Sequence, residues 1–308
     1  MYYIRHYSYT SKNPHLKELL ENRFGIPCKK YEHGIDQRCF SYYFDVPENH
    51  PQFQEIEPYL PTPTPIIPGE ISNRDNDYTS VLYYPQYSEQ EFLEAKWLTV
   101  RSSYSKVFPE DTPNLTVRTY PCLARVTARG ISLMRHEVCV SGSFALKKPI
   151  KWGKRFFASA NGMGEDILFC NSNARTAMEE TGLTGVEYES VQRKSTGKEM
   201  EDIFYLKAKN ILADVAIVPI SDMDTYICDQ CGMHMVGYRN LRGQFGIRAD
   251  MINDSVDFYR TLPLFSPGLE DSSSIFGNDR LIVSQRFYQL VKSLKMDRAL
   301  WFEPITLV

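Results

Sequence analysis

The sequence lacks any apolar segment long enough for a membrane-spanning helix. Its longest apolar run, Ile211 to Ile220, is short and contains Asp214, whereas such a helix needs about 20 consecutive apolar residues. The first residues, Met1 to Asn13, also lack the apolar stretch of a secretory signal. We therefore expect a soluble protein of the cytoplasm that has no membrane partner.

A disulfide framework and a strong net charge are also missing. The seven cysteines are an odd number without regular spacing, so we expect free thiols in a reducing compartment. The formal net charge is −3, which disfavours nucleic-acid binding through overall charge. One short basic stretch, Lys147 to Arg155, surrounds Trp152. It either holds phosphates or forms a solvated loop.

Sequence signatures of catalysis are absent as well. The chain has no G-x-S-x-G, no H-E-x-x-H and no Walker phosphate loop. His136 and Glu137 resemble an acid–base pair, but neighbours in a strand point to opposite faces of a sheet. We therefore predict a protein that is not an enzyme. The alternative is an enzyme whose reactive residues converge only in the fold.

The most informative pattern present is a strand–helix–strand unit over residues 279–305. Leu281 to Val283 is a short apolar run typical of a buried strand, and Ser284 is suited to cap the next helix. The alternating residues from Leu300 to Ile305 predict the closing strand. The helix between them has one apolar face, formed at positions i, i+3, i+4 and i+7 by Phe287, Leu290, Val291 and Leu294.

The same pattern occurs earlier, over residues 166–191. Asn171 takes the place of Ser284, and one inserted residue in the later copy aligns the closing strands. We predict an α+β fold with mixed sheets, in which this strand–helix–strand unit is duplicated within a C-terminal domain of residues 151–308. Residues 1–150 are predicted to form an N-terminal α+β region. The matching helix positions of the earlier copy are Ala174, Ala177, Met178 and Thr181.

A proline-rich segment runs from Pro47 to Pro68. Its prolines prevent a long helix or a central strand, and its first part is acidic and aromatic. It forms either an extended surface connection or an arm that contacts a partner. The residues predicted to make that contact are Glu48, Phe53, Glu55, Glu57 and Tyr59.

Cys228-x-x-Cys231-Gly232 has the spacing of a zinc knuckle. Two thiolates separated by two residues can bind one ion across a tight turn, which the glycine permits. A structural zinc site needs four ligands, and the sequence has no second such pair. Cys228 and Cys231 therefore hold one structural zinc, act as a redox pair, or remain in a hairpin without metal.

Four segments of the C-terminal part carry motifs in a fixed order, namely Cys228 to Gly232, Asp257 to Arg260, Leu281 to Phe287 and Leu300 to Glu303. Together they resemble the C-terminal half of the double-CXXCG motif proteins of bacteria. The resemblance covers about residues 222 to 306. It implies an immunity protein that neutralises a toxin delivered by neighbouring cells, and related immunity families share such endings. The first CxxCG of that family is missing here, and Cys28 is its nearest remnant, which leaves the metal site incomplete.

These observations predict an immunity protein that binds and occludes a cognate protein toxin without chemistry of its own. Aromatic anchors would supply most of the affinity and charge would steer the approach. A zinc-ribbon-like module that binds nucleic acid through Lys147 to Arg155 is the alternative that predicts salt-sensitive affinity.

Overall fold

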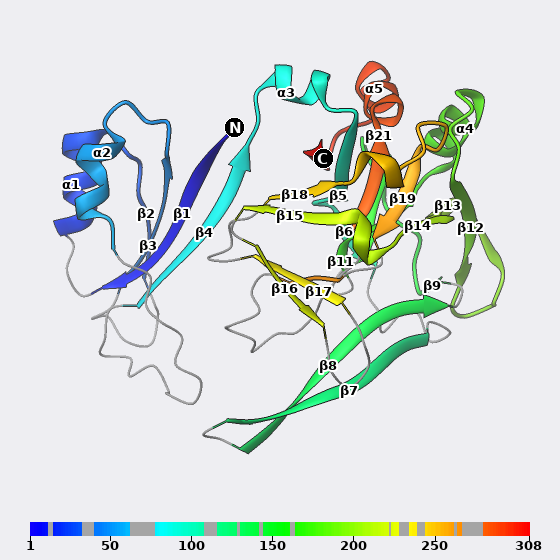
Figure 1. Ribbon diagram of the computed structural model, residues 1–308, viewed down its shortest axis with the longest axis horizontal. Helices are drawn as coiled ribbons and strands as arrows, with labels where there is room; N and C mark the ends of the chain where they lie inside the picture. The colour runs from blue at the N-terminus through cyan, green and yellow to red at the C-terminus, as the bar shows by residue number, and fades with distance from the viewer. Residues whose placement is uncertain are drawn as a thin grey trace. The chain divides into compact units, whose positions relative to one another are not determined.

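The structure is a computed structural model of two compact units (Figure 1). One unit is formed mainly by Met1–Ser88 and the other by most of Glu89–Val308. The division at Ser88 corrects the boundary predicted near residue 150, because strands before that point already belong to the larger unit. No helix in the described part of the chain is both long and apolar enough to cross a bilayer. The described residues are 1–11, 15–32, 40–61, 78–107, 116–127, 130–141, 144–160, 164–221, 223–227, 234–238, 244–261, 264–266 and 280–308.

The smaller unit is an antiparallel sheet with helices on one face. Its strand order is β2-β3-β1-β4. Helices α1 and α2 contribute Leu20, Phe24 and Ile56 to a core with the strand residues Tyr7 and Phe44. Alternate residues of a strand share a face, so the alternation in β1 and β3 places this core on one side. The elements are β1 (Tyr2–Ser11), α1 (His15–Phe24), β2 (Lys29–Glu32), β3 (Phe40–Pro47), α2 (Phe53–Ile56), the 3₁₀ turn η1 (Glu57–Tyr59) and β4 (Tyr78–Gln86).

The larger unit is built on two mixed sheets. Their strand orders are β6-β10-β11-β13-β12-β9 and β14-β19-β21-β5-β22-β18-β15. One core is shared by both sheets and by helices α4 and α5, and the other face of each sheet carries a core of its own. The strands of the first sheet are β6 (Ser105–Val107), β9 (Ala145–Leu146), β10 (Phe157–Ala160), β11 (Gly164–Cys170), β12 (Val186–Arg193) and β13 (Glu199–Ala208).

The strands of the second sheet are β5 (Trp97–Ser102), β14 (Asn210–Leu212), β15 (Ile217–Ser221), β18 (Gln244–Ile247), β19 (Phe258–Thr261), β21 (Leu281–Ser284) and β22 (Leu300–Leu307). The helices are α3 (Glu89–Glu94), α4 (Ser172–Glu180) and α5 (Gln285–Ser293), with 3₁₀ turns η3 (Asp214–Ala216) and η4 (Ala249–Met251). The smaller pairings are β7 (Thr116–Thr127) with β8 (Gly130–Ser141), and β16 (Met223–Ile227) with β17 (His234–Tyr238) and β20 (Leu264–Ser266).

Both predicted repeats form a strand, a helix and a strand, namely β11-α4-β12 and β21-α5-β22. Each helix begins at the predicted cap. The Asn171 side chain accepts a hydrogen bond from the Ala174 amide at 3.0 Å, and Ser284 accepts one from the Phe287 amide at 3.4 Å. Four of the predicted face residues, Ala174, Met178, Phe287 and Val291, are buried in the shared core. Ala177 and Leu290 are only half-buried. Thr181 and Leu294, the last predicted residue of each face, are exposed, which corrects that part of the prediction.

The duplication extends well beyond the two predicted units. In the first sheet β11 and β12 flank β13, and in the second β21 and β22 flank β5, antiparallel throughout. The outer strands follow the same pattern of parallel and antiparallel neighbours. Even the cross-strand ion pairs are repeated, since Lys207 binds Glu189 at 2.6 Å and Arg101 binds Glu303 at 2.9 Å. The correspondence therefore covers all six strands of the first sheet and every strand of the second except β15.

The chain after each helix repeats the same backbone conformation. Gly182 has φ 65° and the equivalent Lys295 has φ 56°, while Gly185 and the equivalent Ala299 both have φ 82°. Positive φ is strained for residues with a Cβ. The second copy therefore keeps a conformation that glycine adopts without strain, although its sequence has lost both glycines.

The two copies exchange their first strands. β5 lies at the centre of the second sheet and leads, within a few residues, to β6 of the first sheet. β13 lies at the centre of the first sheet and leads to β14 of the second. We call residues 97–193 the first half and residues 199–308 the second half. Each half thus supplies the central strand of the other half's sheet.

We expect Gly185→Ala to lower the free energy of unfolding by about 2–3 kcal/mol, from backbone strain and overpacking. A Cβ at Gly185 would lie 2.6 Å from Val256 Cγ1 and 2.9 Å from the Phe258 carbonyl oxygen. Gly182→Ala is the control, because a Cβ there meets nothing within 4 Å and only the strain of roughly 1 kcal/mol remains. Urea unfolding measures both variants, and equal losses would contradict the close approach at Gly185.

Candidate functional site

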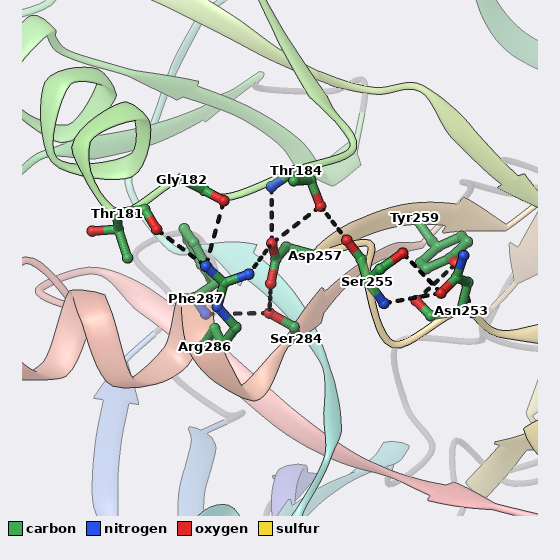
Figure 2. Close-up of polar contacts among 10 residues, drawn as sticks. All are labelled: Thr181, Gly182, Thr184, Asn253, Ser255, Asp257, Tyr259, Ser284, Arg286 and Phe287. Carbon is green, nitrogen blue, oxygen red and sulfur yellow. Dashed lines mark hydrogen bonds and ion pairs between the residues drawn. The ribbon is translucent and has the colours of Figure 1, made fainter.

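A buried carboxylate, Asp257, lies at the centre of a polar junction in the larger unit (Figure 2). It immediately precedes β19 and is 1% exposed. One of its oxygens accepts a hydrogen bond from the Ser284 hydroxyl at 2.5 Å. The other accepts from the Thr184 amide at 2.8 Å and from Arg286 Nη1 at 3.0 Å. Both carboxylate oxygens are therefore satisfied by groups of the protein.

The junction joins the two halves. Thr184 follows α4 in the first half, whereas Asp257, Ser284 and Arg286 belong to the second. Arg286 Nη2 also donates to the Thr181 carbonyl oxygen, at 3.1 Å, at the carboxyl end of α4, where a cation is favourable. Phe156 occupies the position equivalent to Asp257, so the first half has no carboxylate at that position. Asp257 and Ser284 to Phe287, two of the motif segments, are thus brought together as a structural contact.

A second cluster surrounds Arg5 in the smaller unit and contains the predicted partner-binding arm. Arg5 donates to Glu48 at 2.7 Å and to Glu57 at 2.9 Å, and its guanidinium lies 4.7 Å from the centre of the Phe53 ring. Burial alone would lower the pKa of Arg5, but its hydrogen bonds to Glu48, Tyr7 and Glu57 outweigh burial and raise it. Arg5 therefore fixes the arm against its own sheet.

The arm has an inner and an outer side. Glu48 and Phe53 are half-buried beside Arg5, whereas Glu55 is exposed and the Glu57 side chain is 51% exposed. Tyr59 is 43% exposed, and its ring packs on Phe24. The outer side thus presents two carboxylates and one aromatic ring, which we call the outer arm surface (Glu55, Glu57 and Tyr59).

The net negative charge of the chain falls within residues 1–88, which form most of the smaller unit. Residues 1–88 contain eight Lys and Arg against eleven Asp and Glu, whereas the remaining residues contain equal numbers of both kinds. The whole formal charge of −3 therefore comes from the part of the chain that carries the outer arm surface. This distribution favours the approach of a cationic partner.

Two cysteines have described side chains, Cys28 and Cys170, and both are buried free thiols. Cys228 and Cys231 lie outside the described residues, between β16 and β17. Within the described part of the chain, no three His, Cys, Asp or Glu side chains gather as metal ligands. Burial, with a smaller effect of Glu21, raises the pKa of Cys28 to about 11. Burial also raises the pKa of Cys170, so both thiols remain protonated at neutral pH.

The predicted phosphate-binding stretch, Lys147 to Arg155, is partly used by the protein itself. Trp152 donates its indole N–H to the Asp202 carbonyl oxygen at 3.1 Å and packs against the outer core of the first sheet. The Arg155 guanidinium lies 4.2 Å from the centre of the Tyr104 ring. Lys148, Lys151 and Lys154 are exposed, but the aromatic ring that would stack on a base is engaged elsewhere.

Sequence reasoning missed Arg5, Thr184 and Arg286 as the residues that organise these clusters. Arg5 is 43 residues from Glu48, and Thr184 is 73 residues from Asp257. The local signals were present, because Arg5 is a lone cation in a strand of apolar and aromatic residues and Arg286 stands in the first turn of a helix. No sequence spacing indicated which carboxylates they bind.

Comparison of the chain with known protein families, with curated proteins and with solved structures gave no match. The functional proposal therefore rests on the residues and on their arrangement.

Proposed function

We propose that this protein is an immunity protein that binds a bacterial protein toxin and covers its active site. The observation that carries the proposal is the outer arm surface, in which Tyr59 and two carboxylates are exposed on a segment fixed by Arg5 and Arg23. Aromatic residues commonly supply the anchors of protein interfaces. Carboxylates around an anchor steer a cationic partner and fix its orientation.

The preformed arm supports tight binding for an energetic reason. Ordering a flexible side chain at an interface takes about 0.5–1.5 kcal/mol from the binding energy. Glu57 and Tyr59 already contact Arg5 and Arg23 within the free protein. Most of their ordering is therefore complete before a partner arrives.

The proposal predicts that replacing the outer arm surface abolishes protection. The cognate toxin is sought first among the products of the neighbouring genes. Cells that express it should survive with the natural protein and die with the triple variant Glu55→Gln, Glu57→Gln, Tyr59→Ala. Loss of one aromatic anchor alone should weaken binding by about 2 kcal/mol, roughly thirtyfold in Kd. Pull-down of the complex from the same cells gives the direct measurement.

The matched control is the triple variant Glu180→Gln, Glu199→Gln, Trp301→Ala. It removes the same kinds of side chain from exposed positions of the larger unit, and it should protect as the natural protein does. No complex with the natural protein would refute the immunity function. Equal protection by both variants would show that the toxin binds another surface, without contradicting the immunity function. Salt-sensitive binding of DNA or RNA through Lys148, Lys151 and Lys154 would favour the nucleic-acid alternative.

A further inference from the structure

The exchanged strands β5 and β13 make each half of the larger unit incomplete without the other. β5 is buried along its length, with Trp97, Leu98 and Val100 between 0% and 1% exposed. Leu98 and Val100 belong to the shared core, whereas Trp97 belongs to the outer core of the second sheet. Without β5, the edges of β21 and β22 and two cores would be open to water. The second half alone therefore lacks the central strand of its sheet.

The exchange is reciprocal at the level of individual contacts. Ser103 after β5 donates its amide to the Ala299 carbonyl oxygen at 2.9 Å, and Lys209 after β13 donates to Gly185 at 2.9 Å. Ala299 and Gly185 are equivalent, so the two crossings have the same geometry. This is the arrangement of a strand-exchanged dimer in which the two subunits are joined in one chain.

The covalent link between the halves is short and lies at the surface. It is the turn between β12 and β13, and every residue from Arg193 to Glu199 is exposed. The turn closes through local backbone bonds, such as that from the Gly197 amide to the Arg193 carbonyl oxygen at 2.8 Å. The association of the halves rests instead on the shared core, the exchanged strands and the Asp257 junction.

We propose that the two halves are a self-recognising pair and that a second copy of this chain is a partner they fit. The first half of one molecule can bind the second half of another once the turn is opened. The pairing of β5 and β13, the shared core and the Asp257 junction would then all be contacts between molecules. The inference does not depend on the immunity function.

The test cuts the folded protein in the turn. A recognition site for a sequence-specific protease is inserted between Ser195 and Thr196 of the full chain, and the protein is cleaved after it has folded. We expect the fragments to elute together in gel filtration at physiological salt and to separate only in denaturant. The uncut insertion variant is the control for folding.

A second measurement detects the exchange between copies. Cut protein with an affinity tag at residue 1 is mixed with cut, isotopically labelled protein, and both are unfolded in urea and refolded together. Capture through the tag should recover labelled second halves in the proportion in which they were mixed. Fragments that separate or precipitate after cleavage, or a second half that stays folded alone, would overturn the proposal.

Discussion

Phe287→Ala is expected to lower the free energy of unfolding of the larger unit by about 3–5 kcal/mol. Phe287 is 0% exposed and lies in the shared core. Its ring centre is 6.0 Å from that of Phe157 and 5.2 Å from that of Phe258. Those two residues occupy equivalent positions in the two halves, so Phe287 packs against both. Its removal would leave a cavity where the halves meet.

The duplication explains why the shared core needs a large side chain from only one of the helices α4 and α5. The position equivalent to Phe287 in α4 is Ala174, which is also 0% exposed. A large residue on one helix and a small residue on the other fill the shared core without overpacking. Trp301→Ala serves as the control for Phe287→Ala, because Trp301 is 48% exposed. Urea unfolding should show a loss of less than about 1 kcal/mol for this surface change, and a similarly small loss for Phe287 would contradict the packing.

Asp257→Ala is expected to be the second most damaging change, with a loss of about 2–4 kcal/mol. The substitution removes the acceptor of the Thr184 amide, the Ser284 hydroxyl and Arg286. The lower part of this range is favoured, since the Arg286 side chain is 51% exposed and water partly replaces the lost carboxylate.

Asp254→Ala provides the matched control three residues away. Asp254 forms an ion pair with Lys96, but its side chain is 61% exposed, and such pairs contribute about 0–1 kcal/mol. Thermal and urea unfolding of both variants should therefore separate a buried junction from a surface ion pair. A loss at Asp257 no larger than that at Asp254 would show that the halves associate without the junction.

The sequence predicted the features that depend on residues close to one another in the chain. The caps at Asn171 and Ser284, the apolar helix faces and the inserted residue before Ala299 all follow from local spacing, and the structure forms both strand–helix–strand units in an α+β fold. The repeat could be recognised because each unit has its own hydrophobic period.

The exchange of β5 and β13 could not be read from the sequence. A buried central strand has the same apolar pattern whichever sheet it joins, and β5 joins strands that lie far along the chain. The boundary predicted near residue 150 differs from the division at Ser88 for the same reason. The sequence of Trp97 to Ser102 does not indicate that this strand pairs with β21 and β22 of the larger unit. The orientation of the arm depended on Arg5, which lies 52 residues from Glu57.

We propose that this protein inhibits a toxin by covering its active site. The most direct measurement is the activity of the purified toxin as this protein is added in increasing amounts. We predict a linear fall that reaches zero at one equivalent, with the titration of the Glu55, Glu57 and Tyr59 triple variant displaced to much higher concentration. Full toxin activity in the presence of excess natural protein would contradict the claim.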